Sequence, residues 1–278
     1  SEMCIRDSIY TFIIVYVNTI NVPKLQLFIQ FLLISRHTID RDMANPYFQF
    51  KKFTVWHDKC AMKVGTDGVL LGAWTSVESA HRILDIGTGT GLVALMLAQR
   101  SLPDANIVAL EIDEAAVGQA RENIIRSPWK ERVEVVQADF RKYRSSDKFD
   151  VIVSNPPYFV DSLECPDRQR AAARHNDSLT YEDLLEGVSG LLTENGFFTV
   201  VIPADVAERV KKIASIKKLY AVRQLNVITK PGGIPKRVLI TFSFSNQECI
   251  VEELLTELAR HQYSEEYMTL TRDYYLNM

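Results

Sequence analysis

Short apolar runs alternate with longer amphipathic segments along most of this chain. From Met43 onward, strand-like runs are followed by helical segments, which is the pattern of a doubly wound parallel α/β sheet. No repeat or low-complexity tract interrupts this alternation. We expect strands at residues 82–86, 106–110, 133–136, 149–154 and 197–202, and helices directly after Gly91 and at residues 114–125, 181–192 and 204–218.

The later part of the pattern predicts a β-hairpin. Residues 221–229 and 237–243 have strand character, and the segment between them contains two prolines and two glycines within residues 231–235. Such a segment favours a chain reversal over a continuing strand. Asn195 and Gly196 are likewise expected to form a turn that leads into the strand at residues 197–202.

The first 42 residues do not follow this alternation. Residues 9–20 and 25–34 are apolar, but neither run reaches the roughly 18–20 residues that cross a bilayer. The segment also lacks the basic leader and small-residue cleavage site of a secretory signal. We therefore expect an N-terminal extension over residues 1–42 and a catalytic unit over residues 43–278, with no membrane involved. Deletion of the extension should leave activity intact.

Composition bounds the class of protein. The 278 residues are 47% hydrophobic and 24% charged, which suffices for the core of one large α/β domain and excludes a wholly disordered chain. The formal net charge of −3 is unusual for a nucleic-acid binder, because phosphate contacts require lysine and arginine. Basic residues are nevertheless concentrated at residues 168–174, 209–218 and 230–237. We expect the middle stretch to be a solvated helix face.

The four cysteines are far apart in the sequence, at Cys4, Cys60, Cys165 and Cys249. They form no CxxC pair and have no histidine at the spacing of a metal ligand. We expect reduced thiols in a cytoplasmic protein, with neither a disulfide framework nor a metal site.

A glycine-rich turn follows the first expected strand. Gly87, Gly89 and Gly91 alternate with threonine, so the spacing is GxGxG and not the GxGxxG of dinucleotide-binding turns. Glycine allows the backbone to approach a ligand closely, and this spacing favours a nucleoside over a pyrophosphate. Twenty residues after Gly91, Glu111 ends the next strand, where its carboxylate can accept hydrogen bonds from both ribose hydroxyls. The combination predicts a pocket for a nucleoside-containing cofactor.

The segment Asn155-Pro156-Pro157-Tyr158 directly follows the strand at residues 149–154. It suits the methylation of a planar amine, whose lone pair is drawn into a π system. The Asn155 carboxamide oxygen and the Pro156 carbonyl can accept both N–H bonds of such an amine. The prolines stiffen the turn, and Tyr158 offers a ring on which a planar substrate can stack. By itself, the motif is equally compatible with a rigid turn after a strand.

Together these residues resemble the class I S-adenosylmethionine-dependent methyltransferases that carry an N-P-P-[YFW] motif. Residues 47–53, 63–74 and 270–276 are similar to segments of the bacterial tRNA adenine N6-methyltransferases that modify valine tRNA beside its anticodon. The resemblance extends from about Tyr47 to the C-terminus. It implies S-adenosylmethionine as the cofactor, tRNA as the partner, and a mostly parallel seven-stranded Rossmann-like sheet with one reversed strand. A monomer is favoured.

The resemblance also implies roles for individual residues around the cofactor. Asp85 would hydrogen-bond the glycine turn or water near the methionine portion. Asp139 would read the adenine amine, with the Phe140 backbone N–H beside it. Contacts to the amino-acid tail would come from the N-terminal side of the pocket, at Thr66 and Asp67, and Asn155 would border the cofactor as well as the substrate. For Asp113 we favour a helix N-cap.

Two groups of residues are candidate RNA contacts. Arg170, Arg174 and His175 follow the Asn155 motif closely enough to border the substrate. We expect phosphate contacts from the arginines and a polar position at the rim, not base catalysis, for His175. The second group lies in the loop between the hairpin strands and consists of Lys230, Lys236 and Arg237.

Other functions remain open at this point. The same motif would suit methylation of a glutamine side chain in a release factor, although the 20 or so residues between Met43 and Lys63 cannot provide the helical N-terminal domain typical of those enzymes. It would also suit a base in ribosomal RNA or DNA, because the motif reads amine geometry and not the polymer. A catalytically silent RNA-binding module on the same fold is the alternative from a different class.

Overall fold

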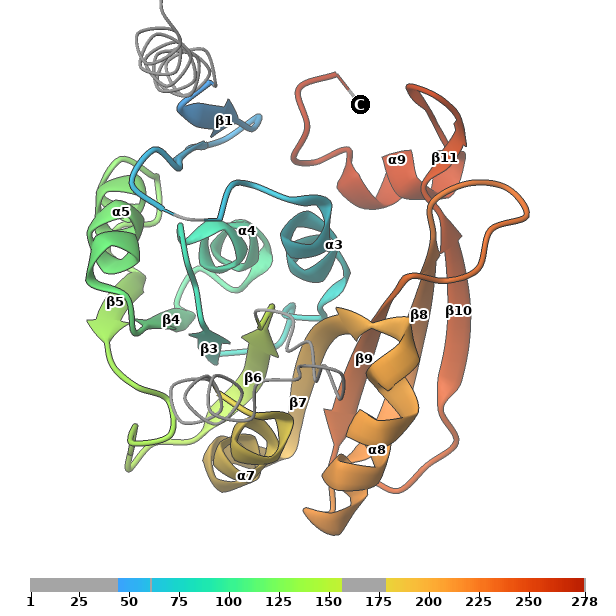
Figure 1. The fold of residues 1–278 in the computed structure, drawn as a ribbon. Helices are drawn as coiled ribbons and strands as arrows, with labels where there is room; N and C mark the ends of the chain where they lie inside the picture. The colour runs from blue at the N-terminus through green and yellow to red at the C-terminus, as the bar shows by residue number, and fades with distance from the viewer. Residues whose placement is uncertain (1–44, 61, 157–178, 278) are drawn as a thin grey trace, which may run out of the picture. The chain divides into compact units, whose positions relative to one another are not determined.

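A computed structural model describes residues 45–60, 62–156 and 179–277 of the protein. Residues Tyr47–Met278 form a compact unit of their own. Its centre is a sheet that contains eight of the described strands (Figure 1). In chain order these are β3 (Arg82–Ile86), β4 (Asn106–Glu111), β5 (Val133–Gln137), β6 (Phe149–Ser154), β7 (Leu192–Pro203), β8 (Tyr220–Ile228), β9 (Arg237–Ser243) and β10 (Ile250–Leu255).

The strand order across the sheet is β10-β8-β9-β7-β6-β3-β4-β5. All neighbouring strands are parallel except where β9 pairs antiparallel with both β7 and β8. From β3 the chain continues to β4 and β5 on one side and then returns to β6 on the other side. The direction of the strand order therefore reverses next to β3, between β4 on one side and β6 on the other. In open α/β sheets, ligands bind outside the carboxyl ends of the strands at such a reversal.

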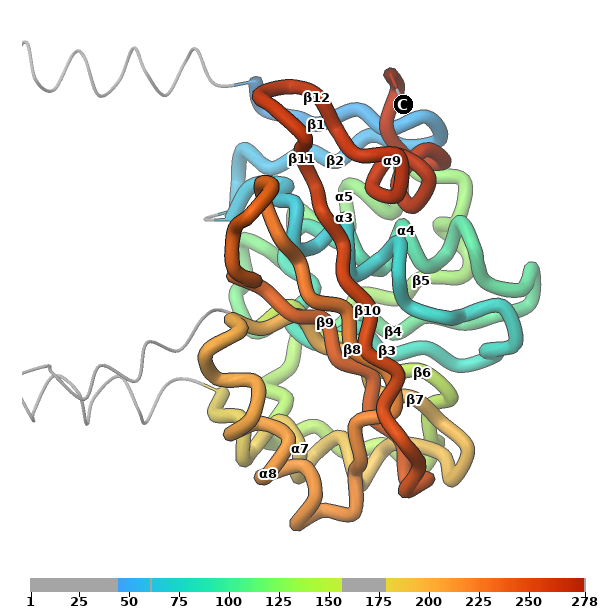
Figure 2. Tube along the Cα trace, turned by 90° about the vertical axis from the view of Figure 1, so that its right-hand side faces the viewer, coloured from blue at the N-terminus to red at the C-terminus, as the bar shows by residue number. Residues whose placement is uncertain are grey.

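Helices cover both faces of the sheet, and Figure 2 shows the two helical layers from the side. One face carries α3 (Thr66–Trp74), α4 (Leu92–Arg100), α5 (Glu114–Ile125) and α9 (Glu265–Thr271), and the other carries α7 (Tyr181–Leu191) and α8 (Ala207–Ile216). Successive strand residues face opposite layers: Val151 and Val153 lie in the core with α3, α4 and α5, whereas Ile152 lies in the core with α7 and α8. Strands buried on both faces explain the nearly continuous apolar runs in the sequence.

Two small elements extend this architecture. β1 (Tyr47–Gln49) and β2 (Thr54–Trp56) form an antiparallel hairpin, and β11 (Glu257–Ala259) pairs with β12 (Gln262–Tyr263). The N- and C-terminal parts of the unit meet where the Lys51 backbone N–H donates to the Tyr274 carbonyl at 2.7 Å. The rings of Phe48 and Phe50 lie 5.8 Å from that of Tyr275. Backbone pairing and aromatic packing therefore fasten the β1–β2 hairpin to the C-terminus.

The predicted fold class is confirmed, including the single reversed strand, which is β9. The count of seven strands is wrong, because β10 adds an eighth strand by pairing in parallel with β8 at the edge of the sheet. Its sequence, IVEELL, has four exposed or half-buried positions before the buried Leu254, so it lacks the apolar run of a central strand. This strand is held mainly by its backbone pairing with β8.

Two boundaries also differ from the predictions. The expected turn at Asn195 and Gly196 lies within β7, at an irregularity where Phe149 pairs with Leu192 but Val151 pairs with Phe197. The extra residues bulge out of the ladder without ending the strand. The helix expected at residues 204–218 begins as a short 3₁₀ turn, η1 (Ala204–Val206), before α8. The hairpin of β8 and β9 is confirmed.

Candidate functional site

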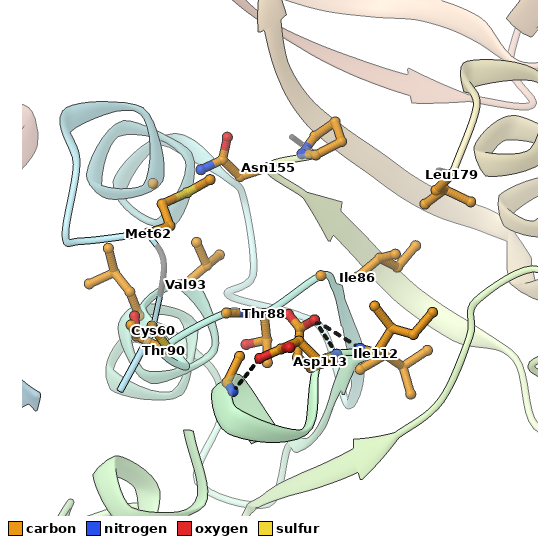
Figure 3. A pocket seen from close by; sticks show the side chains of 18 of the residues that line it. Cys60, Met62, Ile86, Thr88, Thr90, Val93, Ile112, Asp113, Asn155 and Leu179 are labelled. Carbon is orange, nitrogen blue, oxygen red and sulfur yellow. Dashed lines mark hydrogen bonds between the residues drawn. The ribbon is translucent and has the colours of Figure 1, made fainter. Parts of the chain in front are cut away.

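A pocket of about 850 Å³ opens where the carboxyl ends of β3, β4 and β6 meet. Figure 3 shows Asn155 and Met62 on one side of it and Ile112 and Asp113 on the other. Its described wall comes from six parts of the chain: residues 60, 62–63 and 65–68, the turn after β3 with the start of α4, the residues from the end of β4 to α5, residues 138–141, Asn155 with Pro156, and Leu179. Most of the predicted cofactor contacts therefore surround one cavity.

The glycine-rich turn forms the floor of this pocket. Gly87 and Gly89 line it and have φ values of 72° and 56°, a left-handed conformation that side chains disfavour. A Cβ atom built on either of them would meet nothing within 4 Å, so the space over the backbone is free for a ligand. Gly91, with φ 81°, instead faces α5, where a Cβ would lie 3.5 Å from that of Ala120. The third glycine thus allows the turn to pack against a helix.

Glu111 joins the end of β4 to the glycine turn. One carboxylate oxygen accepts from the Gly89 backbone N–H at 2.9 Å, and the other accepts from the N–H groups of Ile112 and Asp113 at 2.8 and 3.0 Å. These three bonds fix the orientation of the carboxylate at the pocket wall. Asp113 caps α5 by accepting from the Ala116 N–H at 2.8 Å, as predicted, and it also lines the pocket.

Asp85 lies beneath the glycine turn and does not line the pocket. Its side chain is buried, and one oxygen accepts from the Thr88 hydroxyl at 2.6 Å and from the Ala94 N–H at 3.2 Å. Burial raises the pKa of this carboxyl to about 7, against the opposing effect of the two hydrogen bonds. Of the two contacts predicted for Asp85, the structure contains the one to the turn.

Asp139 and Phe140 form the wall beside β5. Asp139 lies in a bidentate pair with Arg141, whose Nε and Nη2 donate to the two carboxylate oxygens at 3.0 and 2.8 Å. The hydrogen bonds from Arg141 hold the pKa of Asp139 below its usual value. Phe140 is buried and packs against Gly187 of α7, where a Cβ would lie 2.5 Å from the ring. Arg141 therefore fixes the carboxylate that the family resemblance assigns to a contact with the adenine amine.

Asn155 and Pro156 complete the wall at the end of β6. Ser154, directly before them, donates its hydroxyl hydrogen to the Ile86 carbonyl at 3.0 Å, which ties the exit of β6 to that of β3. Opposite lies the first turn of α3, where a Cβ on Gly68 would be 3.8 Å from the Asn155 amide nitrogen. Thr66 and Asp67 lie in the same turn and line the pocket, as expected.

One predicted RNA residue reaches the pocket wall. Arg237, the first residue of β9, pairs with Asp67 through its Nε at 3.0 Å. Lys230 and Lys236 are exposed in the loop before β9. The predicted RNA contacts Arg170, Arg174 and His175, and the motif residue Tyr158, lie outside the described residues.

The stretch at residues 209–218 behaves as a solvated helix face, as expected. Three of its basic side chains pair with carboxylates of α7 or α8: Arg209 with Glu182, Lys211 with Glu208, and Lys217 with Glu186. Among the described residues, no group of three or more His, Cys, Asp or Glu side chains is placed to hold a metal ion. Cys60 and Cys249 are free thiols.

Several pocket residues were not found by sequence reasoning. Ile112, directly after Glu111, is 57% exposed and presents an apolar side chain to the cavity, as do Met62 and Leu179. An apolar side chain in such a position suits a flat ring. Cys60 lines the same wall, and burial raises the pKa of its thiol to about 11, so it remains protonated at neutral pH. Only the position of Ile112 beside Glu111 offered a sequence signal.

This arrangement can hold a flat nucleoside-like ligand over glycine backbone, with a carboxylate fixed at one side. The remaining corner offers the Asn155 carboxamide and the Pro156 carbonyl as acceptors for the hydrogens of a planar amine. The described part of the chain contains no helix that is long and apolar enough to span a bilayer.

Comparison with known proteins agrees with this geometry. The Methyltransferase small domain family matches residues 62–224. Curated relatives named tRNA1(Val) (adenine(37)-N6)-methyltransferase include one from Bacteroides thetaiotaomicron, 78% identical over 85% of this chain and 100% of the relative, and one from Phocaeicola vulgatus, 55% identical over the same shares. A solved structure from Agrobacterium tumefaciens, described as a predicted O-methyltransferase, is 19% identical with a TM-score of 0.60 and covers 77% of this chain and 100% of its own. That last likeness concerns the fold alone.

Proposed function

The chain belongs to the Methyltransferase small domain family and, within it, to the group named tRNA1(Val) (adenine(37)-N6)-methyltransferases, and we propose that it transfers a methyl group from S-adenosylmethionine to N6 of adenine 37 in valine tRNA. The observation that carries the proposal is the meeting of three strand ends at one pocket. These are the glycine turn after β3, Glu111 after β4, and the Asn155-Pro156 corner after β6.

The residues present fit S-adenosylmethionine. The open space over Gly87 and Gly89 accommodates a ligand pressed against the backbone, and Ile112 provides an apolar wall for an adenine ring. Glu111 would accept from the ribose hydroxyls, and Asp139 from the adenine amine. Thr66 and Asp67 would lie at the amino-acid tail. When bound, the cofactor supplies a methyl group that is already activated by its sulfonium.

The protein's main task is then to position the target amine. The Asn155 carboxamide oxygen and the Pro156 carbonyl would each accept one N–H of the adenine N6 amine. These two bonds would draw the nitrogen lone pair out of the π system and orient it for attack on the activated methyl group, and the amine proton would then be lost to solvent. Alignment of this kind contributes several kcal/mol to catalysis, about 7–11 kcal/mol in well-oriented model reactions. No strong base is needed, and Tyr158 is proposed to stack on the target base.

The tRNA would approach along the basic loop before β9. Lys230, Lys236 and Arg237 are the proposed phosphate contacts from this loop, and Arg170, Arg174 and His175 those that follow the motif. The target adenine must leave its stack before it can enter the pocket. That step costs a few kcal/mol, and less in an anticodon loop than in a duplex.

The test is to incubate the protein with isotopically labelled S-adenosylmethionine and total RNA from a strain that lacks the activity. Mass spectrometry of the digested RNA should find labelled N6-methyladenosine in valine tRNA and nowhere else. The Asn155→Ala variant is the control for chemistry at the pocket. Label in ribosomal RNA, or in DNA or a release factor added to the same reaction, would overturn the substrate assignment.

We also propose that residues 43–278 are the catalytic unit and that residues 1–42 are dispensable. The compact unit Tyr47–Met278 contains all the described residues that line the pocket, which supports this division. A protein that starts at Met43 should therefore methylate tRNA as fast as the full chain, and a large loss of activity would contradict the proposal. Because one chain supplies the whole described wall and the substrate is tRNA, we propose a monomer that acts in the cytoplasm.

A further inference from the structure

We propose that Asn123 of α5, with Gln119 one turn before it, positions the segment that forms one wall of the cofactor pocket. This segment, the pocket strap, comprises residues 56–60 and 62–68. It begins at the end of β2 and runs to the first turn of α3. The inference rests on the proposed function, because it takes the pocket as the S-adenosylmethionine site.

The strap supplies a large part of the wall but has little regular structure of its own. Cys60, Met62, Lys63 and residues 65–68 all line the pocket. Between the end of β2 at Trp56 and the start of α3 at Thr66, the described residues form neither a helix nor a strand. The position of this wall therefore depends on contacts made at the two ends of the strap.

Asn123 makes the principal contact at the first end. It is completely buried, and its side-chain oxygen accepts from the Trp56 N–H at 2.9 Å. Its amide nitrogen donates to the Trp56 carbonyl at 2.8 Å and to the Thr90 carbonyl at 2.8 Å. The side chain thus pairs with the backbone of Trp56 as a neighbouring strand would. The third bond reaches the glycine turn that forms the pocket floor.

Gln119 adds a second contact on the same face of α5. It is also completely buried, and its side-chain oxygen accepts from the Lys59 N–H at 3.0 Å. The Lys59 ammonium group pairs with Glu122 at the surface of the helix. α5 therefore holds the strap at Trp56 and at Lys59, and the lining residues start immediately afterward at Cys60.

The second end of the strap is fixed independently. A Cβ on Gly68 would lie 3.1 Å from Leu92 of α4, and Asp67 pairs with Arg237 of β9. Because this end adjoins Asn155 and the first end adjoins Thr90, a correctly held strap sets the width of the pocket between wall and floor. A buried side-chain amide whose oxygen and nitrogen are both bonded, as in Asn123, is suited to such a role, since each lost bond leaves a buried backbone group without a partner.

Neither Asn123 nor Gln119 lines the pocket, so their effect on the cofactor must pass through the strap. The role predicts a distinct kinetic signature. A displaced wall weakens cofactor binding, whereas the Asn155-Pro156 corner, which follows β6 directly, keeps its position. Loss of either amide should therefore raise the KM for S-adenosylmethionine while kcat at saturating cofactor stays close to that of the wild type.

The experiment compares Asn123→Ala and Gln119→Met with Ser264→Ala. Ser264 is buried and caps α9 away from the pocket, so its loss destabilises the protein without touching the strap. We would measure S-adenosylmethionine affinity by calorimetry at a temperature where thermal melts show each variant to be folded, together with KM and kcat. Asn123→Ala should weaken cofactor affinity about tenfold, Gln119→Met about threefold, and Ser264→Ala less than twofold.

Two results would overturn the positioning role. One is wild-type cofactor affinity in both folded strap variants; the other is an equal loss of affinity in Ser264→Ala, which would make the effect one of stability alone. If Asn123→Ala does not fold, Gln119→Met decides the question. A wild-type protein that binds no S-adenosylmethionine would instead refute the proposed function, and one that binds it but leaves tRNA unmodified would refute only the substrate.

Discussion

The chain leaves β3 after Ile86 and β6 after Ser154, at neighbouring positions of the sheet. The residues that follow these two strand ends, here called the β3 exit and the β6 exit, contribute different chemical groups to the pocket wall. Ile86 and Ser154 are register partners, and the Ser154 hydroxyl bonds the Ile86 carbonyl. After Ile86 the pocket wall is glycine backbone in a left-handed conformation, held from below by the buried Asp85. After Ser154 the wall is the Asn155 carboxamide and a proline. The first exit can contribute close backbone approach, and the second can contribute acceptors aimed at a substrate.

From this difference we expect the two exits to serve separate functions, cofactor binding and methyl transfer. We expect the β3 exit, which is made of backbone, to bind the ligand through its shape, with neighbouring side chains such as Glu111 affecting mainly the affinity. We expect the β6 exit, which presents one side-chain oxygen, to affect mainly the rate. Substitutions at the two exits should therefore separate cofactor binding from methyl transfer.

The largest effect is expected at the β6 exit. Asn155→Ala removes the carboxamide oxygen that would accept one N–H of the target amine. We expect kcat to fall by about a hundredfold or more, comparable to the loss of one preorganised transition-state hydrogen bond. Cofactor affinity should change little, because the glycine turn and Glu111 remain in place.

Asn226→Ala serves as the matched control, since Asn226 lies on β8 and does not line the pocket. Single-turnover rates with valine tRNA and calorimetric titration of S-adenosylmethionine provide the two measurements. Equal losses of rate and of cofactor affinity in Asn155→Ala would remove the distinction between the two exits.

The next largest effect is expected beside the β3 exit. Glu111→Ala removes the proposed ribose acceptor and leaves the backbone N–H groups of Gly89, Ile112 and Asp113 without their partner. We expect the Kd for S-adenosylmethionine to rise at least tenfold, corresponding to about 1.4 kcal/mol. The rate at saturating cofactor should change far less.

Glu114→Ala is the control for charge, because Glu114 is exposed at the start of α5 and outside the pocket wall. Equilibrium titration of both variants with S-adenosylmethionine separates the loss of the Glu111 contact from the loss of one negative charge near the pocket. A Glu111→Ala protein with unchanged cofactor affinity but a collapsed rate would reverse the roles proposed for the two exits.

A smaller effect is expected on RNA binding, from a residue that belongs to neither exit. Lys236→Ala removes a proposed phosphate contact next to Arg237, which itself is paired with Asp67. We expect tRNA affinity to fall a few-fold and the slope of log affinity against log salt concentration to decrease by about 1. Lys217→Ala, at a lysine paired with Glu186, should leave both quantities unchanged. A salt-independent affinity in the wild type would contradict phosphate contacts altogether.

The sequence predicted the parallel part of the sheet closely, and the reason is physical. β6 was expected at residues 149–154 and α5 at residues 114–125, and both bounds agree with the structure. Strands buried on both faces are marked by apolar runs, and Asp113 marks the helix start with a side-chain cap. β10 was missed because an edge strand with exposed positions carries neither signal.

Site residues could be predicted where the local backbone or the position at a strand end requires a particular residue type. Gly87 and Gly89 are needed for their backbone conformation, and Glu111 follows at the end of the next strand. The strap contacts of Asn123 and Gln119 could not be predicted in this way. They join residues more than 55 positions apart, and a polar residue inside a helix has the same sequence signature whether it faces solvent or a buried backbone.

The smallest effect on methyl transfer is expected from the buried carboxyl beneath the β3 exit. Asp85 is held under the glycine turn, outside the pocket wall, so Asp85→Asn should preserve cofactor affinity within a few-fold. Its effect should appear in stability against pH. In the folded protein the Asp85 carboxyl retains its proton up to about pH 7, whereas in the unfolded chain it loses the proton at about pH 3.9. Between those values the folded state binds more protons than the unfolded state, so stability decreases as pH rises and levels off above about 7.

Asp85→Asn removes this titration while retaining an oxygen that can accept from Thr88 and Ala94. The variant should therefore gain stability relative to the wild type as pH rises from about 4 to 7, by an amount on the order of a few kcal/mol. Ser154→Ala, at the base of the β6 exit, provides the matched control, because its hydroxyl does not titrate and its loss should cost the same stability at every pH. Urea unfolding of the three proteins at a series of pH values measures the effect. If wild type and Asp85→Asn show parallel curves, the pKa of the buried Asp85 carboxyl is not raised in the folded protein, and a pH dependence confined to the β3 exit is contradicted.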